Sequence, residues 1–452
     1  MSIYPLAGMP KQKQLWGWIS FDIANQSFTL IINTLLFAIF FGQVVVRDDA
    51  IDDRIWALTF GTSMLLTALA SPIAGALVDQ KGWKKRFLVG SGLSCGILTC
   101  LLGTVQPGQI AWAVALYIPA NFFYSIGENF LASFLPVVAP SKSIGRVSGF
   151  SWGCAYFAAI LLLVSTAAIM HTQGLMEPTA WRPFFVFAGL WFLCFTVPTM
   201  MFLPEPPASE EDGPEGGALK GGFSVLWESL LHTLQYRDLS VLLGASLVYG
   251  TAMSTIVFFA GKIADEYGFT QVKLVLFVAV ITLSGVTGTL LPMLFQDKIG
   301  HRKTTLILLS VWLFSTLFFS AYAAYYDHMD GQIATWPLWL IGNLLGFGLG
   351  SLGSANRAFV GYLAPEGHEG AVFGLWGLTF KISAIMTFPF AYVRDTMGTP
   401  TSLLLLAGMV VVGIVVTTMV DEKRGRKLAE AEAVHADVHT GGSGSSNQAP
   451  DA

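Results

Sequence analysis

Residues Gly75-Ala-Leu-Val-Asp79-Gln-Lys-Gly82-Trp-Lys84-Lys85-Arg86 form a short charged segment between two long apolar runs. A shorter version, Asp297-Lys-Ile-Gly300-His-Arg302-Lys303, again separates two apolar runs. An Asp, a Gly three residues later and then basic residues, all occurring twice, form a pattern that a membrane transporter needs and an enzyme does not. We therefore predict two similar membrane-embedded halves that move against each other.

The composition supports a membrane location and excludes several other classes. Hydrophobic residues make up 54% of the chain and charged residues only 12%, whereas about 25% is usual in a soluble domain. The net charge of -4 and the scattered basic residues do not fit a nucleic-acid partner. The four cysteines lie in apolar runs without Cys-x-x-Cys spacing, so we expect neither a metal, nor a disulfide, nor a bound cofactor.

Apolar runs long enough to cross a bilayer recur along the chain. A spanning helix needs about 20 apolar residues, and the first run is too long for the core of a signal peptide. One large soluble helical core is excluded because too many runs exceed the length of a soluble core helix. By the criterion of about 20 apolar residues, the sequence contains twelve candidate spans: 16–41, 55–78, 87–105, 111–139, 147–170, 183–203, 238–260, 272–296, 304–326, 336–364, 371–393 and 401–420.

The basic residues predict the orientation and the division of the chain. Lys and Arg are concentrated in the termini and in every second loop, which places both termini in the cytoplasm by the positive-inside rule. We expect an N-terminal six-helix bundle at 1–203, a cytoplasmic linker at 204–237, a C-terminal six-helix bundle at 238–420 and a disordered cytoplasmic tail at 421–452.

The expected linker has two parts. Pro204-Glu205-Pro206-Pro207 ends a helix, and the acidic, Gly-rich residues that follow are typical of a solvated segment. Apolar residues then recur at helical spacing between 223 and 234, which predicts an amphipathic helix at the membrane surface. It could connect the halves passively or dock a partner.

The two halves share a second motif besides the charged loop. An Ala-Pro pair precedes three residues at fixed spacing, namely Ala139-Pro140 with Gly145, Val147 and Gly149, and Ala364-Pro365 with Gly370, Val372 and Gly374. The offset between the copies is close to that between the charged loops. The sequence therefore predicts a parallel repeat of six spans plus six, an all-α integral membrane fold with twelve transmembrane helices.

These features resemble the major facilitator superfamily. Within it, Trp18-x-x-Phe21-Asp22-x-Ala24-Asn25-x-Ser27-Phe28 is similar to the opening of the vacuole-effluxer-like branch, which is named for autophagy-related vacuolar amino-acid exporters. Further fragments fit the same branch: Phe134-Leu135-Pro136, Gly145-Arg146-Val147-Ser148-Gly149, Asn356-Arg357 and Phe373-Gly374-Leu375 with Lys381. Two positions depart from it, because Ala132 stands where Asn is frequent and Tyr249-Gly250-Thr251 stands where an Asp is common.

Four charged residues lie inside the expected spans: Asp22, Glu128, Arg357 and Lys381. An ionisable residue in mid-span costs about 2.5–3.5 kcal/mol on insertion scales. Two acids and two bases can neutralise one another, and the resemblance implies that spans 1, 4 and 10 line a central cavity. We expect these four residues to handle substrate or protons; the alternative is that they are structural ion pairs.

Two amides accompany the acids. Asn25 lies one helical turn from Asp22 on the same face, and Asn129 follows Glu128. Either amide could donate to a substrate or satisfy its neighbour.

The two charged loops carry the expected gating residues. A carboxylate at Asp79 or Asp297 can accept hydrogen bonds from the positive N-terminus of another helix, and a Gly allows the turn to close. Such a contact can form in one conformation and break in the other; the alternative is a pure topology signal. The residues assigned to gating are Gly75, Asp79, Gly82, Lys84, Arg86, Asp297, Gly300 and Arg302.

The sequence thus predicts a secondary transporter that works by alternating access. It has no phosphate-binding Gly-x-x-x-x-Gly-Lys-Ser/Thr loop, no His-Glu-x-x-His and no Gly-x-Ser-x-Gly, so we expect neither ATP hydrolysis nor enzymatic activity. The resemblance implies outward movement of amino acids or similar small zwitterions. The acids Asp22 and Glu128 make protons candidate coupling ions, and we expect a monomer in a bacterial cytoplasmic membrane. A multidrug or metabolite exporter and a non-transporting sensor on the same fold remain alternatives.

Overall fold

The computed structural model describes residues 6–48, 52–175, 177–206, 231, 233–269, 271–329, 333–366 and 368–430. Most of the amphipathic helix expected at 223–234, and the tail after residue 430, lie outside the described residues. All regular elements within these ranges are helical: α1 (Gln12–Ser27), η1 (Phe28–Leu35), α2 (Leu36–Phe40), η2 (Phe41–Val46), α3 (Asp52–Lys81), α4 (Lys84–Leu102), α5 (Ile110–Ser133), α6 (Leu135–Val138), η3 (Ser141–Ser143), α7 (Ile144–Gln173), η4 (Pro178–Ala180), α8 (Arg182–Phe202), α10 (Arg237–Glu266), α11 (Gln271–Met293), α12 (Gln296–Ile299), α13 (His301–His328), α14 (Trp336–Leu363), α15 (Glu369–Ile385) and α16 (Phe388–Thr418).

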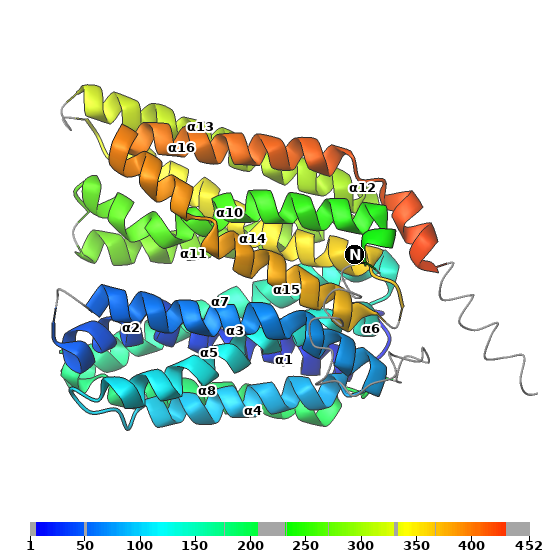
Figure 1. Cartoon of the computed structure of the whole chain (residues 1–452), viewed down its shortest axis with the longest axis horizontal. Coiled ribbons are helices and arrows are strands. Elements are labelled where there is room, and N and C mark those ends of the chain that lie inside the picture. The colour runs from blue at the N-terminus through cyan, green and yellow to red at the C-terminus, as the bar shows by residue number, and fades with distance from the viewer. Residues whose placement is uncertain are drawn as a thin grey trace, which may run out of the picture.

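The long helices lie side by side in two bundles (Figure 1). One bundle contains α1 to α8 and the other α10 to α16; we call them the N-half and the C-half. Each has its own apolar core, built around Phe37 and Tyr117 in the N-half and around Tyr249 and Trp312 in the C-half. The start of α1 and the last described residues lie at the same end of the molecule, here called the termini end.

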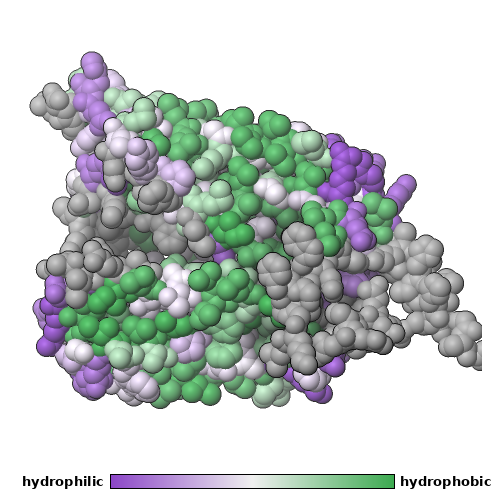
Figure 2. All heavy atoms as spheres, viewed as in Figure 1, coloured by the Kyte–Doolittle hydropathy of each residue, from purple (hydrophilic) through white to green (hydrophobic). Residues whose placement is uncertain are grey.

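The outer surface fits a bilayer. Figure 2 shows apolar residues along the visible sides of both bundles and hydrophilic residues gathered at the two ends. Large apolar side chains such as Leu58, Phe157 and Phe314 are more than half exposed on this surface. In water such an array would be costly, whereas in lipid the chains meet an apolar solvent.

Ten helical segments of the described chain are long and apolar enough to cross a membrane, and an eleventh, Leu58–Ser71 with Ile73–Asp79, qualifies if its bend is counted within one span. The expected span 371–393 is divided between α15 and the start of α16. α15 has 17 residues, and α16 turns sharply at Gly398, whose φ of 84° interrupts the helix. The count of twelve spans therefore stays a prediction.

The first span changes its winding halfway. After α1 the backbone becomes π-helical over η1 and again over η2. A π-helix has a wider turn and is rare, and it frequently occurs at functional sites. η1 carries Thr29 and Asn33, whose side chains bond to α5. The change in winding thus occurs where α1 faces polar groups of α5.

The halves contact each other through α3 with α15 and through α7 with α11 and α14. Glycines permit the closest approaches. A side chain at Gly75 would overlap the carbonyl oxygen of Gly370, and one at Gly149 would lie 2.8 Å from the Thr289 carbonyl oxygen. Because both contacts involve backbone, they leave no room for a larger residue.

Residues 422–430, which we expected to belong to a disordered tail, form a short helix, the terminal helix. It is fixed by side chains that the sequence alone did not connect. Arg424 pairs with Asp238 at 2.7 Å, and Arg426 donates to the Ser141 hydroxyl at 2.8 Å and to the Tyr362 carbonyl at 3.2 Å. The terminal helix therefore contacts both halves.

Candidate functional site

A cavity of about 500 Å³ lies between the two halves. Asp22, Glu128, Asn129, Arg357 and Lys381 line it, so the structure brings together five of the six residues predicted for substrate or proton handling. The cavity also has apolar walls, formed by Phe60, Met64, Met253, Val257, Leu349 and Phe380.

Asn25, the sixth residue, is buried and is not one of the lining residues. Its side-chain oxygen has no hydrogen-bond partner within the part of the chain that the structure describes. The predicted role as a direct donor to substrate is therefore less favoured for Asn25 than for Asn129.

Asp22 and Arg357 form a buried ion pair across the halves. Arg357 Nη1 on α14 lies 2.9 Å from Asp22 Oδ2 on α1. Two serines of α7 complete the contact: Ser151 donates to Asp22 at 2.5 Å, and Ser148 accepts from Arg357 Nε at 3.1 Å. Both charges are therefore compensated by partners within the protein, although the two residues also line the cavity.

Aromatic rings hold the guanidinium of Arg357 in place. Its central carbon lies 4.8 Å from the ring centroid of Trp18 and 5.6 Å from that of Trp152. Cation–π contacts of this kind favour the charged form of Arg in a desolvated site. Ser148 and Trp18 lie in the motifs quoted above, but only the fold shows that both touch Arg357, and Ser151 and Trp152 gave no signal in the sequence.

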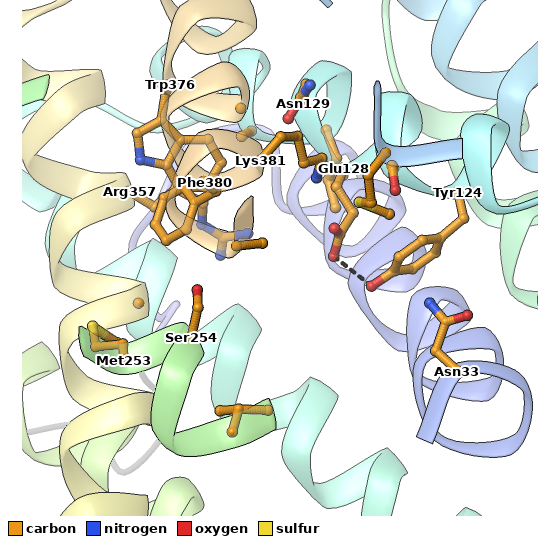
Figure 3. A pocket seen from close by; sticks show the side chains of 18 of the residues that line it. Asn33, Tyr124, Glu128, Asn129, Met253, Ser254, Arg357, Trp376, Phe380 and Lys381 are labelled. Carbon is orange, nitrogen blue, oxygen red and sulfur yellow. Dashed lines mark hydrogen bonds between the residues drawn. The ribbon is translucent and has the colours of Figure 1, made fainter. Parts of the chain in front are cut away.

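Glu128 and Lys381 are the less constrained charges of the cavity. Glu128 on α5 is half-buried and accepts a hydrogen bond from the Tyr124 hydroxyl at 3.0 Å. Lys381 extends from α15 toward Glu128 (Figure 3). Among the described residues, Lys381 has no hydrogen-bond or ion-pair partner. The cavity thus offers one acid and one base from opposite halves.

Asn129 is bonded within the N-half. Its amide nitrogen donates to the Ser71 hydroxyl at 2.8 Å, and eight residues earlier Asn121 donates to Ser63 at 2.6 Å. The equal spacing on α3 and α5 makes a buried polar ladder between them. Its chief effect is to fix α5, and with it Glu128, against α3.

The Asp79 loop contacts the opposite half. Asp79 accepts hydrogen bonds from the backbone N–H groups of Gly370 at 3.0 Å and Ala371 at 2.7 Å, in the first turn of α15. Lys84 Nζ lies 2.9 Å from Asp79 and 3.0 Å from Glu369. All three charged side chains are buried. We call Asp79, Lys84 and Glu369 the buried triad.

The Asp297 loop makes the reciprocal contact. Asp297 accepts from the N–H groups of Gly145 at 2.9 Å and Arg146 at 3.0 Å, in the first turn of α7. Each predicted Asp thus meets the helix that begins in the other half at the second repeated motif. Both contacts hold the halves together at the termini end.

The remaining loop residues have separate roles. Gly82 and Gly300 have φ values of 63° and 100°, so both turns use a conformation that favours glycine. Arg86 is 72% exposed and lies 3.7 Å from Glu205, and Arg302 donates to the Val420 carbonyl at 2.9 Å. In the described ranges of the chain, neither of these two side chains makes a hydrogen bond or ion pair to the opposite half.

Glu369 is the charged residue of the Asp79 contact that sequence reasoning missed. It directly precedes Gly370 in the second motif, where the other copy has Ile144. That difference between the copies was the available signal. In the described part of the chain, no three His, Cys, Asp or Glu side chains are placed to share a metal ion.

Comparison with known families gives a clear assignment. The family described as "Vacuole effluxer Atg22 like" matches residues 52–145 and 138–430. An uncharacterised MFS-type transporter of Bacillus subtilis, YxiO, is 22% identical over 93% of this chain and 97% of that protein. Autophagy-related protein 22 of Kluyveromyces lactis is 25% identical over 74% of this chain and 73% of that protein.

Solved structures agree on the architecture. The human organic anion transporter MFSD10 superposes with a TM-score of 0.72 at 13% identity, covering 90% of this chain and 99% of that one. The proton:xylose symporter XylE gives 0.68 at 14% identity, covering 94% and 98%. The predicted major facilitator fold is confirmed, and the chain is a multi-pass membrane transporter rather than an enzyme.

Proposed function

From the premise that this chain belongs to the vacuole effluxer Atg22-like family of major facilitator transporters, we propose that it exports a small zwitterion such as an amino acid. The solute binds in the central cavity between Glu128 and Lys381, and the halves 1–203 and 238–420 move as units around it. A proton carried by Glu128 drives the movement. The contacts of Asp79 and Asp297 close the termini end in one state.

The paired charges of the cavity carry the substrate proposal. A zwitterion places its ammonium group against Glu128 and its carboxylate against Lys381, so no charge is left uncompensated in a partly apolar site. The apolar walls then accommodate an aliphatic side chain. A purely anionic solute would leave Glu128 opposed to like charge, and a sugar would leave both charges without a partner.

Glu128 is the better proton carrier of the two acids. Asp22 already has Arg357 and Ser151 as partners, whereas Glu128 faces the cavity with one hydroxyl partner. A carboxylate in an apolar cavity is easier to protonate, and a nearby cation opposes this. Opening and closing the cavity alters both effects, which is what proton coupling requires.

Ligand-induced stabilisation tests the substrate class. We would heat the purified chain with leucine, with N-acetyl-leucine, which lacks the ammonium charge, and with leucinamide, which lacks the carboxylate. A ligand at about 100 times its Kd adds about 2.7 kcal/mol to the free energy of unfolding. We expect leucine alone to raise Tm; equal stabilisation by N-acetyl-leucine would instead indicate an organic-anion carrier.

Flux separates a carrier from a sensor and tests the coupling. In proteoliposomes, an imposed pH gradient should drive accumulation of a stabilising solute. Glu128→Gln should abolish accumulation but leave solute exchange, because exchange needs no net proton transfer. Asp22→Asn, tested alongside, should impair both. A protein that binds solute without flux is a sensor.

We further propose a monomer in a bacterial cytoplasmic membrane with both termini in the cytoplasm. Thr179 and Lys303 are exposed at opposite ends of the expected spans and suit single-cysteine labelling. The background would carry Cys194→Ser, since Cys194 is exposed. An impermeant reagent should label Thr179→Cys but not Lys303→Cys in intact cells; the reverse pattern would overturn the orientation.

A further inference from the structure

Glu128 is the first member of a chain of three hydrogen-bond contacts that ends on the backbone of α1. The Tyr124 hydroxyl lies 3.0 Å from Glu128 Oε1, and the Thr29 hydroxyl lies 2.8 Å from the Tyr124 hydroxyl. Thr29 also lies 2.9 Å from the carbonyl oxygen of Asn25. Figure 3 shows the first of these contacts beside Lys381.

The number of hydrogens in this chain depends on the charge of Glu128. Tyr124 and Thr29 carry one hydroxyl hydrogen each, so two hydrogens serve three contacts when Glu128 is ionised. Protonation of Glu128 supplies the third. The carboxyl then donates to Tyr124, Tyr124 donates to Thr29, and Thr29 donates to the Asn25 carbonyl, so that every contact is a hydrogen bond.

Loss of the proton leaves one contact without a hydrogen. Tyr124 then donates its hydrogen to the carboxylate. The single hydrogen of the Thr29 hydroxyl can be donated either to Tyr124 or to the Asn25 carbonyl, but not to both. Asn25 lies in the last turn of α1, where the winding changes to the π-helix η1. The bonding of α1 at this junction is therefore linked to the proton on Glu128.

We propose that Tyr124 and Thr29 are positioning residues that couple protonation of Glu128 to the conformation of α1. This inference rests on the proposed role of Glu128 as proton carrier. The Tyr124 ring is stacked on Phe28 at 4.9 Å between centroids, so its hydroxyl is held between its two partners. The other titratable or charged groups around Glu128 are Lys381, Asp22, Arg357 and Cys95.

A second tyrosine supplies a matched control. Tyr117, also on α5, donates to the side-chain oxygen of Asn33 at 2.8 Å, and Asn33 donates to Asn121 at 3.1 Å. Like Tyr124, it joins α5 to η1 through its phenol, but among the described residues its hydroxyl has no hydrogen bond to an acid. Tyr117→Phe therefore removes a similar bond without touching the proposed relay.

The test measures the pH response of the conformation and needs no solute. Spin labels at Lys81→Cys and Glu366→Cys, both exposed at the termini end, report the distance between the halves in lipid nanodiscs. The measured quantity is the factor by which the ratio of the two distance populations changes with pH, and the relevant part of it is the part that Glu128→Gln removes. Tyr124→Phe and Thr29→Val should each make this factor about threefold to tenfold smaller, because one hydrogen bond changes a population ratio by about that much. Thr29→Ser and Tyr117→Phe should retain it.

The results distinguish failure of the hydrogen-bond relay through Tyr124 and Thr29 from failure of the proton site at Glu128. If Glu128→Gln removes the response but Tyr124→Phe and Thr29→Val keep it, the relay is wrong and the proton site stands. If Glu128→Gln removes nothing, the proton site fails and the relay with it. Equal losses in Tyr124→Phe and Tyr117→Phe would show that the hydroxyls merely fix α5 to η1, which also overturns the relay.

Discussion

The two charged loops are copies in sequence but not in energetics. Asp79 and Asp297 each accept two N–H groups from the first turn of a helix in the opposite half. Around Asp79 the contact is buried and includes the cation Lys84, which also pairs with Glu369. Asp297 is only half-buried, and in the described part of the chain its partners are the two N–H groups, with no ion pair beside them.

A single position accounts for the difference. Lys84 and Arg302 both lie two residues after the turn glycine, but Glu369 corresponds to the buried Ile144 in the other copy. Without an acid at that position, Arg302 turns to the Val420 carbonyl, and its backbone N–H donates to Glu422 of the terminal helix. The shared element is the capped helix, whereas the buried triad belongs to one loop only. We therefore expect the α3–α15 contact to dominate closure of the termini end.

The largest effect should come from Lys84→Met. The variant leaves the carboxylates of Asp79 and Glu369 side by side without a cation, and breaking a buried ion pair typically costs about 3–5 kcal/mol. We expect a marked fall in Tm of the purified protein. Lys85→Met, an adjacent change at a half-buried lysine, should leave Tm nearly unchanged.

Adding Glu369→Gln to Lys84→Met should restore much of the lost stability, because one of the two repelling carboxylates is then neutral. If the double variant is no more stable than Lys84→Met, the acids do not repel each other as the triad implies.

Asp79→Asn should have the next largest effect, on conformation rather than folding. The amide keeps the size of the side chain, but it turns an NH₂ group toward one of the two N–H donors of α15. Since a hydrogen bond to a charged group is worth about 1.5–3 kcal/mol, the closed population should fall at least about tenfold. Spin labels at Lys81→Cys and Glu366→Cys measure this; an unchanged distance distribution would reduce the loop to a topology signal.

Much of this arrangement could be predicted from the sequence. The duplicated Asp, the turn glycines and the expectation that each Asp meets a helix N-terminus all followed from residue types and spacing. The second motif was also recognised as a repeat. The crosswise pairing, in which Asp79 meets Gly370 and Asp297 meets Gly145, was not predicted, because it depends on how two bundles face each other and not on local pattern.

The cavity shows the same boundary between local and tertiary information. Asp22, Glu128, Arg357 and Lys381 were recognised because a charge inside an apolar run is costly. Their pairing required the fold: Asp22 is tied to Arg357, whereas Glu128 and Lys381 stay open to the cavity. The hydroxyls of Ser151, Tyr124 and Thr29 were missed because such residues are common in apolar spans and carry no charge signal. Ser148 lies in a recognised motif, but its contact with Arg357 was not predicted.

Asp297→Asn should have a smaller effect than Asp79→Asn. The half-exposed side chain leaves room for water to satisfy the N–H groups of Gly145 and Arg146, so only a fraction of the interaction is lost. Labels at the exposed Lys142→Cys and Lys303→Cys should show a change of about threefold in the open population, a few tenths of a kcal/mol to about 1 kcal/mol. Equal effects of the two Asp→Asn changes would remove the asymmetry argued above.

The smallest effect should come from Arg426→Ala in the terminal helix. Arg426 donates to Ser141 of the N-half and to the Tyr362 carbonyl of the C-half, so it bridges the halves beside the Asp297 loop. Its other bond, to Glu430, stays within the terminal helix. Partly exposed pairs are worth about 0.2–1 kcal/mol and are screened by salt. We therefore expect the Lys142–Lys303 label pair to shift toward the open population by at most a few-fold at low salt, and less at high salt.

Arg424→Ala is the matched control for this bridge. It removes an ion pair of the same terminal helix, but the partner, Asp238, lies in the C-half. Arg302, whose N–H group binds Glu422 of the terminal helix, also lies in the C-half. Loss of that pair should loosen the terminal helix without cutting a link between the halves, so the label distance should stay close to that of the parent. An equal shift in Arg424→Ala would mean that the terminal helix acts by its overall docking. A shift as large as that of Asp79→Asn would instead make Arg426, and not the buried triad, the main closure of the termini end.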